Sequence, residues 1–259
     1  MIDSHCHLTD QKFAGDIPAI LERARNAGVE QIITIADSLE ESGQAIVLAE
    51  KYAQIFCAVG IHPHHAKQWK DGDEIRLEKI AHSSPKVRAI GEIGLDYHYD
   101  FSPRDIQQKV FAIQLQLAVE WQLPVVIHCR NAITDIRHTI EGMDMKKIVL
   151  HCCTETWEDV ESLVAQGVSL SFTGIATYSQ SEEIRHVIHK CPINQMMIET
   201  DAPYLPPEAL RAKRGRAVRN EPAFVIDVAQ LIAKIKRVDL AEVDRTTTAN
   251  AMAFFGLSP

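Results

Sequence analysis

The 259-residue chain lacks any run of about 18 consecutive apolar residues, so the sequence offers no candidate for a membrane-spanning helix. It also lacks a Cys-x-x-Cys pair among its six cysteines, which argues against a zinc ribbon and a disulfide framework and predicts reduced thiols. A motif rich in polar residues begins at Asp3 and leaves no room for a cleavable targeting segment. We therefore expect a cytoplasmic location, and no obligate protein partner is implied.

Basic charge and aromatic residues are both scarce. The chain has 27 Lys and Arg against 35 Asp and Glu, a formal net charge of -8, which argues against general coating of nucleic acid by long-range attraction but leaves room for a local basic surface. Beyond Tyr97, Tyr99, Phe101 and Tyr204 there is little aromatic interleaving, so stacking of many bases is not expected. No internal repeat or low-complexity tract divides the chain, and only residues 203–219 read as a long loop. These features predict one domain over residues 1–259.

Hydrophobic periodicity predicts alternating strands and helices. Eight apolar runs are predicted as strands: the opening residues through His7, then 31–36, 55–61, 87–93, 125–128, 148–152, 168–172 and 195–198. Helical spacing covers 16–26, 39–52, 75–81, a long segment around 110–118, residues near 163, 184–188, 224–235 and 243–255. Apolar strands between amphipathic helices indicate a parallel sheet covered on both faces. Eight such units in about 250 residues predict a (β/α)8 TIM barrel, with an open doubly wound sheet as the alternative.

Polar side chains lie at the carboxyl ends of most predicted strands, where barrels of this kind carry their chemistry. In chain order they are His5, His7, His62, Glu92, Asp96, His128, Arg130, His151, Glu199 and Asp201. Ionisable groups at buried strand ends are costly unless a partner compensates them. A bound divalent metal ion is such a partner.

The ligand types predict two metal ions. The candidate ligands are His5, His7, Glu92, His128, His151 and Asp201. His5, His7 and Asp201 could hold one ion and the other two histidines the second, while Glu92 bridges them with one carboxylate oxygen each. Taken singly, each has a plainer interpretation, such as a hydrogen-bonded core histidine or a turn residue. Mg²⁺, Mn²⁺ and Zn²⁺ all remain open, because His and carboxylate ligands suit each of them.

Several stretches of this sequence resemble the TatD family of metal-dependent deoxyribonucleases, which are amidohydrolase-like barrels. They are the opening Asp3, His5 and His7, GIHPH at 60–64, GEIGLD at 91–96, PVVIHCR at 124–130, ETDAPYL at 199–205 and RNEP at 219–222. The resemblance runs in order from residue 2 to residue 255 and implies metals on the six candidate ligands. It also implies contact of His62 with a phosphate. Residues 153–155 depart from the family pattern, which bears on substrate preference.

Roles for the remaining residues follow from two-metal hydrolysis. Asp201 is the predicted general base, accepting a proton from the attacking water, and Glu92 is the second predicted catalytic residue. Asp96 and Glu199 are expected to support the ligands from behind, although Glu199 could equally form a buried salt bridge. His62 and His64 are expected to be exposed on a proline-flanked loop.

Basic residues gather in the predicted loop after the eighth strand: Arg211, Lys213, Arg214, Arg216 and Arg219. Such a run is often only a solvated loop, but beside a metal rim it suits phosphate backbones, and Arg130 and Arg219 are candidate phosphate contacts. We therefore expect hydrolysis of phosphodiester bonds at single-stranded nucleic-acid ends. The resemblance to the TatD family implies a 3'-5' exonuclease acting on single-stranded DNA, or on RNA. The alternative is a small-molecule amidohydrolase or lactonase with the same metals, in which Arg130 alone serves a carboxylated substrate.

Overall fold

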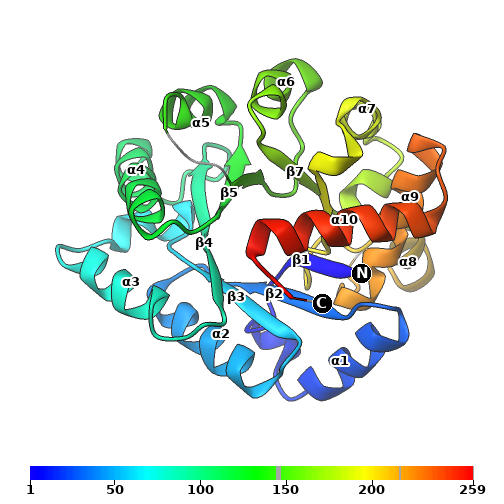
Figure 1. Cartoon of the computed structure of the whole chain (residues 1–259), viewed down its shortest axis with the longest axis horizontal. Coiled ribbons are helices and arrows are strands. Elements are labelled where there is room, and N and C mark those ends of the chain that lie inside the picture. The colour runs from blue at the N-terminus through cyan, green and yellow to red at the C-terminus, as the bar shows by residue number, and fades with distance from the viewer. Residues whose placement is uncertain (144–146, 216, 259) are drawn as a thin grey trace.

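Eight parallel strands form a barrel in the computed structural model, which describes residues 1–143, 147–215 and 217–258 (Figure 1). The strands are β1 Ile2–Cys6, β2 Gln31–Ile35, β3 Ile55–Val59, β4 Val87–Asp96, β5 Val125–Arg130, β6 Ile148–Leu150, β7 Ser169–Phe172 and β8 Met196–Ile198. Their order in the sheet follows the sequence. The last gap is closed by the His7 N–H, which donates to the Ala202 carbonyl at 2.7 Å, and by the Asp201 N–H, which donates to the His5 carbonyl at 2.9 Å. The predicted TIM barrel is confirmed, and the open sheet is wrong.

Helices surround the barrel (Figure 1). They are α1 Ile17–Asn26, α2 Leu39–Lys51, α3 Asp73–Ala81, α4 Arg104–Trp121, α5 Ile133–Ile140, α6 Trp157–Ala165, α7 Glu182–Lys190, α8 Glu208–Arg214, α9 Val225–Lys236 and α10 Leu240–Phe255. Helix α10 lies across one end of the barrel, where Phe254 and Phe255 pack against Ile2 and Ile33. Ile2 is the first residue of β1, so α10 covers the end of the barrel at which the strands begin. The carboxyl ends therefore remain available for a site.

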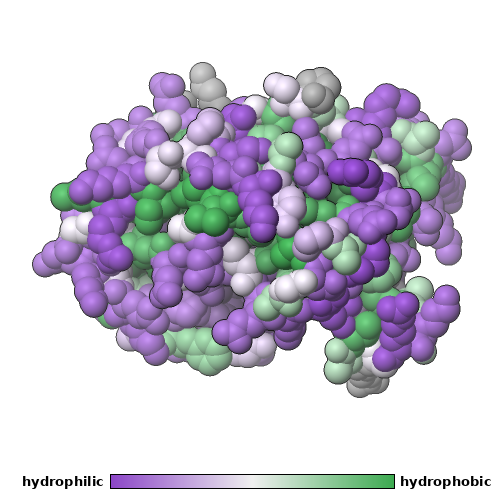
Figure 2. All heavy atoms as spheres, turned by 90° about the horizontal axis from the view of Figure 1, so that it is seen from below, coloured by the Kyte–Doolittle hydropathy of each residue, from purple (hydrophilic) through white to green (hydrophobic). Residues whose placement is uncertain are grey.

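Burial of the strands explains their apolar composition. β2, β3 and β5 place isoleucine, valine and alanine in a core shared with the inward faces of the helices. Outside, the flank of the molecule in Figure 2 carries mostly hydrophilic residues with smaller hydrophobic areas between them. Among the residues described, no helix combines the length and apolar character needed to cross a membrane. The expected cytoplasmic location stays a prediction.

Some details of the predicted elements are wrong: β3 also ends two residues earlier than predicted, and β4 and β5 run further, to Asp96 and Arg130. The predicted loop at 203–219 contains helix α8, because the prolines before it end at Pro207 and strong helix formers follow. Helix α5 was not predicted, although Ile133, Ile136 and Ile140 supply a buried face at helical spacing. Strand β6 ends at Leu150, two residues early, since the backbone at Cys152 turns to φ 45°. Arg216 lies outside the described residues.

Candidate metal centre

A buried carboxyl group on β1 holds the segment that follows β8. Asp3 accepts hydrogen bonds from the Thr200 N–H at 2.9 Å and the Thr200 hydroxyl at 2.6 Å, and burial raises the pKa of Asp3 to about 8. Asp201 follows directly, with φ 53°, in a left-handed conformation that costs energy for most residues and is more accessible to Asp. This backbone brings the Asp201 carboxylate to within 3.2 Å of His7 Nε2.

Close approach of β4 and β5 positions the next two candidates. Gly94 pairs with His128, and a Cβ on Gly94, at φ +143°, would lie 2.0 Å from the His128 carbonyl oxygen. Only glycine satisfies both the backbone angle and this contact. Gly94, the second glycine of the GEIGLD stretch, therefore allows Glu92 on β4 to lie next to His128 on β5.

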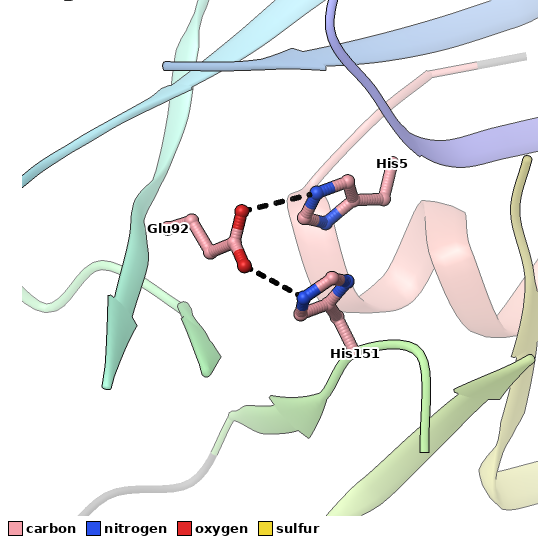
Figure 3. Close-up of side chains that lie close together, drawn as sticks. All are labelled: His5, Glu92 and His151. Atoms are coloured by element: carbon pink, nitrogen blue, oxygen red, sulfur yellow. Dashed lines mark ion pairs between the residues drawn. The ribbon is translucent and has the colours of Figure 1, made fainter. Parts of the chain in front are cut away.

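The carboxylate of Glu92 lies between two groups of imidazoles, and Figure 3 shows it facing His5 on one side and His151 on the other. Its Oε2 is 3.4 Å from Nε2 of His5. Its Oε1 is 2.7 Å from Nε2 of His151 and 2.7 Å from Nδ1 of His128. Each oxygen thus faces a different set of ring nitrogens, as a bridging carboxylate would.

The first set is completed by Asp201. His5 Nε2 and His7 Nε2 lie 3.3 Å apart, and the Asp201 carboxylate is 3.7 Å from the first and 3.2 Å from the second. Side chains of Glu92, His5 and Asp201 are buried or nearly so, with exposed fractions of 4%, 0% and 14%. The donor atoms of His5, His7 and Asp201 fall within 4.8 Å of one another, as do those of His5, Glu92 and His151.

The outward ring nitrogens of His7 and His128 face hydrogen-bond acceptors, and that of His151 faces a carboxylate at ion-pair distance. His7 Nδ1 is 3.2 Å from the Ile35 carbonyl, His128 Nε2 is 3.1 Å from Asp96, and His151 Nδ1 is 3.4 Å from Glu199. Acceptors at these positions keep the protons outside and leave the inner nitrogens as electron-pair donors. Donor type, convergence and orientation all fit divalent metal ions, and these buried His and Glu clusters indicate a binuclear metal site.

The charges inside the cluster favour a cation. Burial raises the pKa of Glu92, but His151, His62 and His128 more than offset this and hold it well below its usual range. Burial lowers the pKa of His7, but the hydrogen bond to Asp201 and its charge raise it to about 9. A metal ion bound at this site would take the place of protons, because ligands must be deprotonated to bind it.

His62 is buried, 8% exposed, which corrects the expectation of an exposed loop histidine. It begins the 3-10 helix Pro63–Gln68, where its Nδ1 accepts from the His64 N–H at 3.1 Å. Burial lowers its pKa to about 4, so the ring is neutral and carries its proton on Nε2, which points at Glu92 Oε1 at 3.5 Å. Although His62, Glu92 and His128 lie close enough to share an ion, this tautomer makes His62 a donor to anionic oxygen.

Asp96 and Glu199, the residues predicted to support the ligands, lie next to His128 and His151. Asp96 is fully buried and accepts from His64 as well as His128, at 2.9 and 3.1 Å. The proximity of His64 to Asp96 was not anticipated from the sequence. Glu199 is buried and accepts from the Cys152 N–H at 2.7 Å. Glu199 was expected either to support a ligand or to form a buried salt bridge. Its carboxylate faces His151 within the protein interior, so one contact corresponds to both interpretations.

The arginines predicted to contact phosphate lie in different environments. Arg130 is exposed at the end of β5, with its guanidinium 4.8 Å from the centre of the Tyr99 ring. Arg219 forms ion pairs with Asp16 and Glu221 at the surface, the second at 2.7 Å. On α8, Arg211 pairs with Glu208 at 2.9 Å, while Lys213 and Arg214 are exposed. Arg211 and Arg219 of the predicted basic loop thus already form ion pairs with carboxylates of the protein itself.

Comparison with known proteins agrees with this geometry. A 3'-5' ssDNA/RNA exonuclease TatD from Erwinia amylovora is 38% identical over 99% of this chain and 100% of its own length. An uncharacterized metal-dependent hydrolase, YabD of Bacillus subtilis, is 34% identical over the full length of both. The crystal structure of YJJV, a TatD homolog from Escherichia coli, superposes with a TM-score of 0.93 at 30% identity, covering 100% of this chain and 98% of that one. The family model described as TatD related DNase matches residues 2–256. This chain is therefore a metal-dependent hydrolase that belongs to the TatD-related DNase family.

Proposed function

We propose that this protein removes nucleotides from the 3' end of single-stranded DNA or RNA by metal-dependent hydrolysis of phosphodiester bonds. The observation that carries the proposal is the division of the Glu92 oxygens, Oε2 toward His5 and Oε1 toward His128 and His151. Relatives named as 3'-5' ssDNA/RNA exonucleases, at 35–38% identity over nearly the whole chain, support the choice of substrate.

In this proposal His5, His7 and Asp201 would hold one ion and His128 and His151 a second, and Glu92 would contribute to both. Mg²⁺, Mn²⁺ or Zn²⁺ bound there supplies Lewis acidity, which lowers the pKa of water and neutralises phosphodiester charge. Asp201 serves as general base, since its carboxylate accepts a proton from the attacking water.

Residues around the ligands bind and orient the substrate. His62 donates its Nε2 proton to an anionic oxygen, either of Glu92 or of the scissile phosphate. Arg130 and Arg219 contact phosphates further along the strand, and Arg219 would first exchange part of its pairing with Asp16 and Glu221. Asp96 and Glu199 keep His128 and His151 in the ligating orientation.

The direct test uses purified protein with a 5'-labelled single-stranded oligonucleotide and Mg²⁺, Mn²⁺ or Zn²⁺. We expect stepwise shortening from the 3' end that stops when a chelator is added. The same DNA as a blunt duplex should be degraded more slowly. Turnover of an amide or lactone, without shortening of DNA or RNA under any of these ions, would establish the small-molecule alternative instead.

A second test concerns the bridge. Replacing Glu92 by Gln keeps the shape of the side chain and removes its charge, so we expect activity and bound metal, measured by elemental analysis, to fall together. Glu155→Gln, a change in a half-buried carboxyl group bonded to Cys129, is the matched control and should leave metal content unchanged. A Glu92 variant with wild-type metal content and rate would remove the bridging role.

A further inference from the structure

Two aromatic rings are exposed beside the metal centre. Tyr99 and Phe101 are 47% and 54% exposed, and their rings stack with centroids 5.2 Å apart and planes inclined by 20°. They lie on the segment between β4 and α4, at the carboxyl end of the barrel. Single exposed aromatic residues are common, but two rings stacked on each other at a functional rim present an outer ring face on which a flat apolar group can stack.

A series of neighbouring rings connects this surface with the candidate ligands. The His64 ring centre lies 4.7 Å from that of Phe101 and 5.5 Å from that of Tyr99. His62 lies 4.3 Å from His64 and 4.5 Å from His128. A group placed on the exposed rings is therefore separated from the His128 side of the centre by the rings of two histidines.

The buried carboxylate of Asp96 binds both the segment that carries the exposed rings and the candidate ligand His128. Asp96 Oδ1 accepts from the backbone N–H groups of His98 and Tyr99, each at 2.9 Å. Its Oδ2 accepts from the rings of His64 and His128. The backbone that carries Tyr99 and the ligand His128 are thus fixed to the same side chain, so the exposed rings are preorganised relative to the metal centre.

A cation completes the surface. The Arg130 guanidinium lies over the Tyr99 ring at 4.8 Å, and Arg130 follows His128 by two residues on β5. Ring faces next to an exposed guanidinium match the two parts of a nucleotide, because bases stack on aromatic rings and phosphates pair with arginine. A hydrophobic protein partner would gain little from the cation.

We propose that Tyr99 and Phe101 form a stacking platform for one nucleobase of a single-stranded substrate, with Arg130 bound to an adjacent phosphate. This inference rests on the proposed nuclease function and adds a cause for strand preference. A base in a duplex is already stacked and paired, so it reaches the platform only after unpairing. Two rings stacked on each other accommodate one base, and the exposed ring of Tyr204 lies elsewhere on the rim, 5.8 Å from that of His7.

The test compares a Tyr99→Ala/Phe101→Ala double variant with the wild-type enzyme, both loaded with Mn²⁺. Each is assayed on a single-stranded oligonucleotide and on the same strand with abasic sites at its last three positions. Loss of one stacking contact predicts a KM roughly 5- to 150-fold higher on the normal strand, with a much smaller change in kcat. On the abasic strand the variant and wild type should have equal KM values.

The matched control is Phe56→Leu. Phe56 also lies under two cations, Lys86 at 4.3 Å and Arg88 at 5.3 Å, but it belongs to the amino-terminal half of β3, away from the site. Its replacement should leave KM unchanged on both strands. Arg130→Gln should raise KM on both strands and weaken the salt dependence, because it removes a phosphate contact.

The possible results separate the platform from the nuclease function. If the wild-type enzyme does not shorten single-stranded DNA or RNA, the proposed function falls and the platform with it. If the wild type is active and the double variant keeps its KM on the normal strand, the platform alone is overturned. An equal rise in KM on normal and abasic strands would also overturn it, since the rings would then contact the backbone rather than a base.

Discussion

Asp96→Asn is the change that tests most directly how the protein orients a metal ligand. The asparagine keeps the size of the side chain and one carbonyl oxygen, which can still accept from the His98 and Tyr99 N–H groups. At the Oδ2 position it places an NH₂ group, which cannot accept the protons of His64 and His128. His128 must then carry its proton on Nδ1, the nitrogen that faces Glu92, and loses its electron pair for the metal.

The size of the effect follows from this loss of orientation. Removing a partner behind a ligating histidine costs about 10- to 100-fold in metal affinity or activity. That range corresponds to about 1.4–2.8 kcal/mol, similar to one hydrogen bond to a charged group. We expect the affinity for the ion on the His128 side to fall by this amount, and the affinity for the ion at His5, His7 and Asp201 to stay unchanged.

Calorimetric titration of the metal-free protein with Mn²⁺ measures the two affinities, and the activity at rising Mn²⁺ shows whether excess metal restores the rate. Asp100→Asn is the control, because Asp100 is exposed and pairs with Arg104 at 2.8 Å at the surface. Two wild-type affinities in the Asp96→Asn protein would show that the carboxylate does not orient His128, and our account of the ligand tautomers would have to be given up.

Two further predictions concern stability and thiol reactivity. Gly94→Ala should prevent stable folding, because its Cβ would lie 2.0 Å from the His128 carbonyl oxygen. A melting temperature within a few degrees of wild type would contradict this. Gly43→Ala is the control, because the space around Gly43 is open. Burial raises the pKa of Cys57 and Cys191 to about 12, so about one part in 10⁴ of each thiol is ionised at pH 8. Alkylation followed by mass spectrometry should therefore be far slower in native than in denatured protein and should quicken as pH rises, whereas equal rates would refute the burial argument.

The candidate ligands and the barrel could both be predicted from local sequence. Apolar runs typical of strands alternate with apolar residues at helical spacing, because each element has to bury one face. This pattern can be recognised from residues that are close in the sequence. In a parallel barrel all strand ends of one kind meet at one rim. Residues such as His5, Glu92 and His151 are therefore brought together by topology alone, although they are far apart in the chain.

Other features depended on contacts that no local pattern records. The 3-10 turn after His62 buries this ring and fixes its tautomer, whereas a proline-flanked stretch reads as an exposed loop. Arg219 is paired with Asp16, which lies 203 residues away, so a run of basic residues overstates the free positive charge. Asp96 holds both the segment of Tyr99 and the ring of His128.

Chemical type and strand position were thus determined by the sequence itself, because they follow from side-chain identity and hydrophobic period. Orientation, pairing and protonation were decided only by the tertiary structure. The physical reason is that a hydrogen bond depends on the distance and angle between two groups, and residues distant in sequence acquire both only when the chain has folded.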